Sequence, residues 1–193
     1  MKAAQTQADL FATPPAMPEG FRYQPNLIGQ GDHDDLAALL ATMPFKPFDF
    51  GGRLANRQVV TFGFGYDYGA HRLREAPPIP EALLPLRAKV AAFAGRPAEA
   101  FVQCLINEYR EGAGVGWHRD RPHFGDVVGV SLLSASPFRF RLKQGDTWLR
   151  RTLTVEPRSA YLISGPARSE WDHSVPPVEA HRYSITFRTM ARG

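Results

Sequence analysis

His118 and Asp120 are the residues whose types and spacing best suit them for chemistry. They lie two positions apart, and side chains two apart in an extended chain point to the same side. An imidazole and a carboxylate are therefore presented to one point in space, as ligands of a metal ion would be. Two ligands hold a metal weakly, so a third is expected from elsewhere in the chain. His173, in the segment Trp171-Asp172-His173-Ser174, is the candidate.

Two histidines and one carboxylate that leave coordination positions open form the facial triad of non-heme Fe(II) sites that activate dioxygen. Such a site needs an oxidisable co-substrate, and a dicarboxylate co-substrate is best held by a bidentate arginine. Arg182 and Arg188 are six residues apart on one predicted strand, so both share a face with Ser184. The alternative is a solvent-facing arginine stripe, whose intervening apolar residues form the core face of the strand.

Length and composition set the frame in which these residues act. A chain of 193 residues, 44% of them hydrophobic, predicts one folded domain over 21–193, after a flexible arm at 1–20. The single cysteine, Cys104, excludes a disulfide framework, and the absence of an apolar leader segment favours a cytoplasmic location. No apolar run approaches the roughly 20 residues of a membrane helix, and monomer is the default expectation.

The charge of the chain is positive, and arginine supplies most of it. The formal net charge is +4, and 19 of the 23 basic residues are arginine. Arginine suits bidentate contact with phosphate, so nucleic acid is a plausible partner. A compositional bias of the genome toward arginine explains the same numbers, so charge alone does not decide.

The elements that must position these residues are mainly strands. Helical spacing of apolar residues predicts helices at 33–43 and 81–95, with a short edge strand at 21–24. From residue 101 onward nearly all signals are β, and the clean alternation of 138–142 predicts one wet face. Strands at this spacing favour a barrel or jelly roll. The predicted strands are 101–107, 126–133, 138–142, 148–155, 160–163 and 182–189.

The segment 59–68 is rich in aromatic and β-branched residues and predicts a strand that runs into a glycine-punctuated loop. Aromatic rings interleaved with arginines can stack on and clamp a nucleobase. The alternative is that half of these rings belong to the core. The residues expected to contact substrate are Phe62, Tyr66, Tyr68, Arg141 and Arg168.

Taken in order, the motifs Asn107-x-Tyr109, His118-x-Asp120, His173 and Arg182-x-Ser184-x-Thr186-x-Arg188 resemble the AlkB family of Fe(II)- and 2-oxoglutarate-dependent dioxygenases. The resemblance covers about residues 59–190. It implies a double-stranded β-helix (jelly roll), mainly β with flanking helices, with an N-terminal α/β extension and a nucleotide-recognition lid formed by the segment 53–74.

The resemblance also implies roles for individual residues. His118, Asp120 and His173 would bind Fe(II), whereas Asn107, Tyr109, Arg182, Ser184 and Arg188 would hold 2-oxoglutarate. Arg188, helped by Tyr109, is expected at the distal carboxylate, and Arg182 nearer the metal end. Family members use O2 to convert 2-oxoglutarate to succinate and CO2 while oxidising a substrate C–H bond. On an N-methyl group of a DNA or RNA base, the product loses formaldehyde.

Two positions depart from the pattern of the nucleic-acid repair members. Ser184 stands where several of them have asparagine, and Pro122 stands where they often have an acidic residue. The substrate class therefore stays open between an alkylated nucleic acid, including tRNA, and a protein side chain, a lipid or a small molecule. A non-catalytic jelly-roll binding module is the alternative from another class, and the intact metal and arginine motifs argue against it.

Overall fold

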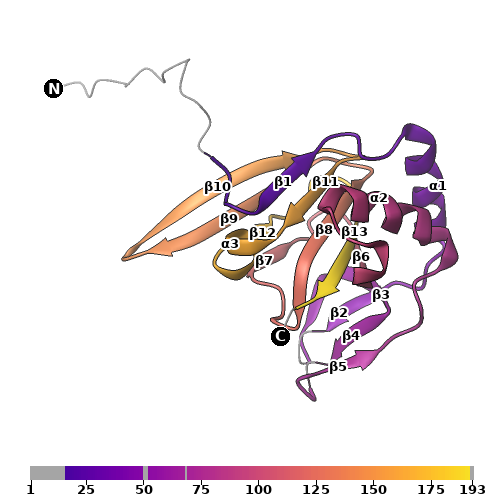
Figure 1. Ribbon diagram of the computed structural model, residues 1–193, viewed down its shortest axis with the longest axis horizontal. Helices are drawn as coiled ribbons and strands as arrows, with labels where there is room; N and C mark the ends of the chain where they lie inside the picture. Colours follow the sequence, from indigo (N-terminus) through magenta and orange to yellow (C-terminus); the bar gives the residue numbers. More distant parts are fainter. Residues whose placement is uncertain (1–15, 50–51, 68, 192–193) are drawn as a thin grey trace.

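The computed structural model describes residues 16–49, 52–67 and 69–191 of the chain (Figure 1). A seven-stranded antiparallel sheet has the strand order β1-β11-β8-β13-β6-β3-β2, and a four-stranded antiparallel sheet has the order β10-β9-β12-β7. The strands of the larger sheet are β1 (Phe21–Gln24), β2 (Lys46–Asp49), β3 (Leu54–Phe62), β6 (Phe101–Tyr109), β8 (Phe124–Leu132), β11 (Ala160–Ile163) and β13 (Arg182–Met190).

The smaller sheet contains β7 (Val115–His118), β9 (Ser136–Gln144), β10 (Thr147–Val155) and β12 (Asp172–Val175). A separate hairpin joins β4 (Phe64–Asp67) to β5 (Arg72–Glu75). Apolar side chains such as Phe138, Phe140 and Ile163 form a cluster between the two large sheets. The jelly-roll expectation is thus confirmed, and β2 and β5 are strands in addition to the predicted ones.

Two helices, α1 (Gln30–Ala41) and α2 (Leu84–Ala94), cover the outer face of the larger sheet (Figure 1). Leu40 and Val90 of these helices belong to one buried cluster with Ile106 and Ile185 of the sheet. Both predicted helices are confirmed, with α1 beginning at Gln30 and residues 81–83 forming the short 3-10 helix η1 (Glu81–Leu83) before α2. The chain turns out of α2 at Gly95, whose φ of +69° favours glycine.

The remaining short elements are a second 3-10 helix, η2 (Ala98–Ala100), and the helix α3 (Gly165–Ser169). Of the expected arm at 1–20, residues 1–15 lie outside the described part of the chain. Residues 16–20 are irregular and anchored, because Ala167 N donates to Glu19 O (2.8 Å) and Arg151 Nε donates to Ala16 O (2.8 Å). Among the described residues, no helix is long and apolar enough to cross a membrane.

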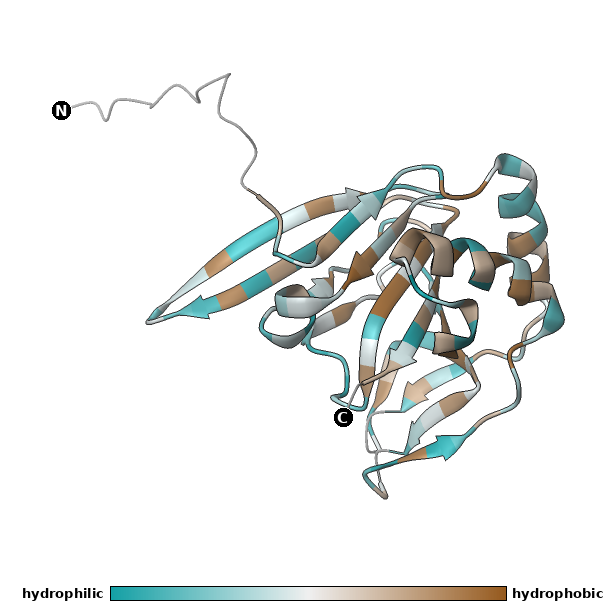
Figure 2. Ribbon diagram, viewed as in Figure 1, coloured by the Kyte–Doolittle hydropathy of each residue, from teal (hydrophilic) through white to brown (hydrophobic). Residues whose placement is uncertain are grey.

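Alternation along β13 and β9 decides which side chains reach the space between the sheets. β13 is paired on both edges, with β6 and β8, and both of its faces are covered. The solvent-facing arginine stripe is therefore wrong, because Arg182 is 1% and Arg188 is 8% exposed. On β9, by contrast, hydrophobic and hydrophilic residues alternate in bands (Figure 2), and the predicted wet face is confirmed.

Candidate metal centre and cleft

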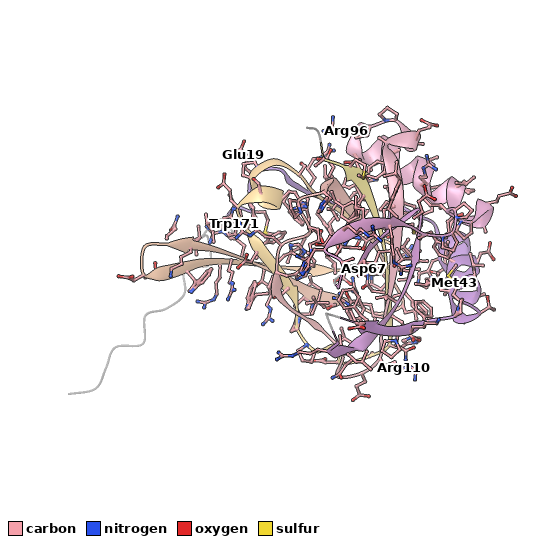
Figure 3. All side chains as sticks on the ribbon, turned by 90° about the horizontal axis from the view of Figure 1, so that it is seen from below. Glu19, Met43, Asp67, Arg96, Arg110 and Trp171 are labelled. Atoms are coloured by element: carbon pink, nitrogen blue, oxygen red, sulfur yellow. The ribbon has the colours of Figure 1, made fainter. Side chains whose placement is uncertain are left out.

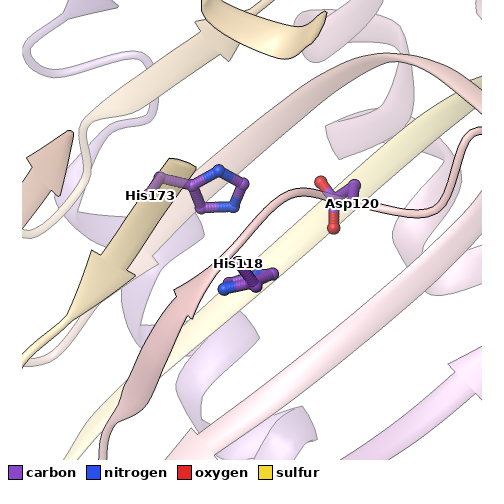
Figure 4. Close-up of side chains that lie close together, drawn as sticks. All are labelled: His118, Asp120 and His173. Atoms are coloured by element: carbon purple, nitrogen blue, oxygen red, sulfur yellow. The ribbon is translucent and has the colours of Figure 1, made fainter. Parts of the chain in front are cut away.

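The smaller sheet brings the two predicted histidine ligands together. His173 on β12 is the register partner of His118 at the end of β7, so both imidazoles face the inner side. Asp120 follows two residues after His118, and the three side chains converge on one space (Figure 4). Their ligand atoms all lie within 4.8 Å of one another. The structure thus assembles the expected set from two strands and one loop.

The neutral state of the two histidines suits metal binding. Burial lowers the pKa of His118, and it lowers that of His173 to about 3 with help from the neighbouring His118. Both rings are therefore neutral near pH 7, which leaves nitrogen lone pairs for a metal. His118 Nδ1 lies 2.9 Å from Gly116 O and donates to it, so Nε2 is the free ligand atom.

Asp120 is ionised, and only one of its two carboxylate oxygens has a hydrogen-bond partner. Its burial would raise the pKa, but the Arg188 guanidinium holds the pKa of this carboxyl well below its usual range. Arg188 Nη2 donates to Asp120 Oδ1 (3.1 Å), whereas Oδ2 is buried without a hydrogen-bond partner. A buried unpartnered carboxylate oxygen beside two neutral imidazoles fits a divalent cation, and these donor types suit iron.

The two buried arginines of β13 occupy different places. Arg188 donates to Asp120 and, through Nη1, to Gln103 Oε1 (3.0 Å), so it lies at the metal end. Arg182 donates through Nε to Ser131 Oγ (3.2 Å), while its Nη1 and Nη2 are buried without partners. The expectation that Arg182 lies nearer the metal than Arg188 is therefore wrong. The even spacing put both on one face but could not order them relative to His118.

Arg182 needs an anion. An unpaired guanidinium buried away from water is costly, and a carboxylate that accepts from both free nitrogens removes most of that cost. The guanidinium carbon lies 5.4 Å from the ring centre of Tyr109, which lines the cleft. The donor set at this deep end therefore fits the distal carboxylate of a dicarboxylate such as 2-oxoglutarate.

Asn107 and Ser184 are register partners on β6 and β13, as are Tyr109 and Arg182. Asn107, Tyr109 and Ser184 are all buried and line the cleft, so the structure gathers the whole predicted co-substrate set on one sheet face. That face lies opposite the metal ligands, which come from the other sheet. The two halves of the candidate site are thus contributed by the two layers of the jelly roll.

Tyr161 is a lining residue that the sequence reasoning missed. It is buried on β11, hydrogen-bonds Ser184, and lies close enough to Arg182 for the two to interact electrostatically. Burial raises the pKa of Tyr161 to about 12 even though Arg182 lowers it, so the phenol stays a hydrogen-bond donor. A Cβ at Gly129 would overlap the Tyr161 ring. That glycine, inside a β-branched strand, was the available signal of a close approach.

The cleft over this site has a volume of about 1390 Å³. Its outer wall comes from β2, β3 and the β4–β5 hairpin, and all of these except β2 overlap the segment 53–74 that was expected to form a lid. Arg57 lies over the Phe48 ring at 4.1 Å, and Arg121, just after Asp120, lies over the Tyr66 ring at 4.6 Å. The wall that faces the metal ligands therefore pairs aromatic rings with guanidinium groups. Arg57 lies within the segment 53–74 that was expected to form the lid, whereas Phe48 was not singled out from the sequence.

The five residues expected to contact substrate lie in different parts of the structure. Tyr66 lines the cleft, and Tyr68 lies outside the described residues. The expectation was wrong for Phe62, which packs against the helix-side core because its side chain turns to that face of β3. Arg168 does not line the cleft either, since it donates to the carbonyls of Arg121, Phe124 and Gly125 and so holds the loop after Asp120. Arg141 lies on the outer face of the smaller sheet.

Comparison with known proteins agrees with this geometry. The model of the 2OG-Fe(II) oxygenase superfamily matches residues 22–188. The Alkylated DNA repair protein ALKBH8 homolog of Arabidopsis thaliana is 26% identical over 147 residues, which cover 64% of this chain and 42% of that protein. The match to a second curated relative covers 49% of that protein. The chain therefore spans less than half the length of both curated relatives.

Two solved structures share the fold. OsALKBH1 superposes with a TM-score of 0.64 at 18% identity, covering 91% of this chain and 98% of that one. A Pseudomonas putida prolyl-4-hydroxylase gives a TM-score of 0.64 at 16% identity, covering 90% and 94%. These likenesses concern the fold alone, because both identities are low. With the family match over most of its length, the chain belongs to the 2OG-Fe(II) oxygenase superfamily, and membership implies Fe(II), 2-oxoglutarate and O2. Within that superfamily the chain is similar to AlkB-type proteins.

Proposed function

We propose that this enzyme oxidatively removes N-alkyl groups, methyl groups foremost, from bases of nucleic acid. Bound Fe(II), with O2 and 2-oxoglutarate, supplies the oxidation of a C–H bond together with release of succinate and CO2. An N-methyl group hydroxylated in this way loses formaldehyde and leaves the free base nitrogen. His118, Asp120 and His173 would hold the metal, since their free ligand atoms converge within 4.8 Å.

The two arginines would divide the work at the co-substrate. Arg182 holds the distal carboxylate through its two unpartnered nitrogens, beside Tyr109 at the buried end. Arg188 fixes the orientation of Asp120 and neutralises charge next to the metal. Asn107 and Ser184, which face each other across β6 and β13, line the path between these two ends.

The observation that carries the substrate class is the wall opposite the metal ligands. There, Arg57 lies over Phe48 and Arg121 lies over Tyr66, so flat rings and cations alternate around an open cleft. A flat base that has left its stack can be held between such rings while guanidinium groups meet its phosphates. The similarity to an alkylated DNA repair protein supports the same class.

The experiment measures succinate and formaldehyde from the full chain with Fe(II), ascorbate and 2-oxoglutarate. N-methylated single-stranded DNA and RNA oligonucleotides are compared with unmethylated strands and with a methylated peptide. We expect stimulation and formaldehyde release with one of the methylated strands. Stimulation by the peptide alone, or by none of the strands, would contradict the proposal.

Two variants at one position sharpen this test. Tyr66→Ala removes the ring in the cleft wall, and Tyr66→Phe keeps it. Because stacking on an aromatic ring is worth about 1–3 kcal/mol per base, Tyr66→Ala should raise the KM for the oligonucleotide about tenfold. Tyr66→Phe should stay near the parent enzyme, and both should keep the slow succinate formation without substrate. Equal behaviour of the two variants toward the oligonucleotide would remove Tyr66 from the substrate site.

A further inference from the structure

The outer face of the smaller sheet carries an unusual set of side chains, which we call the Arg–Trp face. Residues directly opposite in antiparallel strands share a face, and the register places Arg141 opposite Arg150 and Lys143 opposite Trp148. Nitrogen-tipped side chains project from the β9–β10 hairpin in Figure 3. The face consists of Trp117, Arg119, Arg139, Arg141, Lys143, Trp148 and Arg150.

Cations and indoles are stacked on this face. The Arg141 guanidinium carbon lies 4.7 Å from the ring centre of Trp117 and 4.2 Å from that of Trp148. Arg139 lies 5.2 Å from the Trp117 ring, and Lys143 Nζ lies 5.9 Å from the Trp148 ring. Cation–π contacts of this kind hold long side chains in place at an exposed surface. The charged groups are thus ordered before any ligand arrives.

Positive charge on the face is poorly balanced. Asp172 is its only carboxylate among the strands just described, and it pairs with both Arg141 (3.0 Å) and Arg119 (3.2 Å). Like charges directly opposite across a sheet are destabilising, yet Arg141 and Arg150 are register partners. Arg150 and Lys143 are exposed. A face that keeps this excess of cations in order is complementary to a polyanion.

The face continues into the cleft. Trp117 and Arg119 flank the candidate ligand His118, and both line the cleft as well as the face. On β7, His118 faces the metal site and its neighbour Trp117 belongs to the Arg–Trp face. On β12, His173 faces the metal site and its neighbour Asp172 pairs with Arg141 on the outer side. A polymer whose reacting unit lies in the cleft can therefore pass over the mouth at Trp117 onto this face without a break.

We infer that the Arg–Trp face binds the strand of a single-stranded nucleic acid outside the reacting base, an inference that rests on the proposed function. Phosphates contact the arginines and Lys143, and an unpaired base stacks on Trp148. A duplex hides the flat faces of its bases, so an indole platform beside ordered cations favours a single strand. The face gives affinity without reading sequence, whereas the cleft selects the alkylated base.

The test compares two pairs of neutral substitutions in the full chain. Lys143→Gln with Arg150→Gln removes two exposed cations of the face. The matched control, Arg22→Gln with Lys89→Gln, removes two exposed cations on the helical side. Both pairs change the net charge equally. Binding of an unmethylated fluorescent 20-nucleotide single strand is followed by anisotropy at several salt concentrations.

We expect the face pair to weaken binding about tenfold and the control pair less than twofold. Each phosphate contact on a single strand contributes about −0.7 to the slope of log K against log salt, so the face pair should make that slope shallower by about 1.4. Equal slopes for the face pair, the control pair and the parent would overturn the inference.

A second comparison tests the indole platform. Trp148→Ala should weaken binding of the strand about tenfold, and Trp148→Phe should restore most of it, because stacking needs a flat ring. An acidic peptide, polyglutamate, should compete poorly at equal charge concentration, since it offers no base. Equal competition by polyglutamate would favour an acidic protein as partner and would contradict the inference.

Failure of this inference is distinguishable from failure of the proposed function. If unmethylated strands bind through the face but no methylated strand stimulates succinate formation, the proposed reaction fails and the face remains a binding surface. If methylated strands stimulate turnover while the face variants bind and react like the control pair, the proposed reaction stands and the face is excluded.

Discussion

Strands β13 and β9 both carry arginines at even spacing, so that the arginines of each strand share one face, yet they use them in opposite ways. On β13, Arg182 and Arg188 are buried between the sheets, and three of their nitrogens have no partner. On β9, Arg139 and Arg141 are partly exposed, stack on Trp117, and are bonded to Ser174 and Asp172.

The difference follows from the place of each strand. β13 has a neighbour on each edge, the helices cover one of its faces, and the smaller sheet covers the other. A charged side chain there is shielded from water. Its unpartnered N–H donors therefore indicate a ligand that brings the opposite charge. β9 has one face open to solvent. Excess positive charge there costs little free energy because water solvates it, and it stays accessible to a polymer. A buried arginine of this kind is suited to bind a small anionic ligand, whereas an exposed one is suited to a binding surface.

Arg182→Met, which removes the buried cation and keeps its approximate length, should have the largest effect. We expect the 2-oxoglutarate concentration for half-maximal succinate formation to rise at least about a hundredfold, a loss of about 3 kcal/mol for an ion pair out of water. The metal-free, co-substrate-free protein should become more stable, by about 1–3 kcal/mol in urea unfolding, because an unpaired buried charge has gone. A less stable variant that keeps its normal 2-oxoglutarate requirement would contradict the role of Arg182.

Arg188→Met should have a smaller and different effect. Arg188 donates to Asp120, and loss of a residue that orients a metal ligand typically weakens metal binding about 10–100-fold. We expect the Fe(II) requirement to rise by that factor while the 2-oxoglutarate requirement changes less than in Arg182→Met. The measurement is succinate formation against Fe(II) at saturating 2-oxoglutarate. The reverse ranking of the two variants would restore Arg188 as the partner of the distal carboxylate.

Arg139→Gln on β9 should have the smallest effect. It contacts the buried Ser174 Oγ (3.2 Å) and the partly exposed Trp117 ring, but its own side chain stays partly exposed, and such interactions are worth about 0.5–1 kcal/mol. Urea unfolding should shift by no more than that, and succinate formation without nucleic acid should match the parent enzyme. A large loss of stability would show that Arg139 supports the fold as firmly as a buried residue does.

Much of the fold and of the site could be predicted because it depends on local periodicity. Runs of β-type residues bounded by turns, with clean alternation in β9, placed β6, β8, β9, β10, β11 and β13 within a few residues of their observed bounds, and helical spacing did the same for α1 and α2. The spacing of two in His118-x-Asp120, together with the distant His173, named the convergent set. Other assignments depend on which strands become neighbours, and local pattern carries no such information.

The amino-acid sequence was enough to identify the donors: two imidazoles, one carboxylate and two arginines, of which the arginines are evenly spaced and so share one face of β13. Only the tertiary structure decided which arginine lies beside Asp120, that Tyr161 enters the cleft over Gly129, and that Phe62 turns into the core. It also decided that Arg141 serves the outer face of the smaller sheet. The physical reason is that strand pairing and layer packing join residues far apart in the chain, so burial, and with it the need for a charged partner, is fixed only after the sheets have closed on each other.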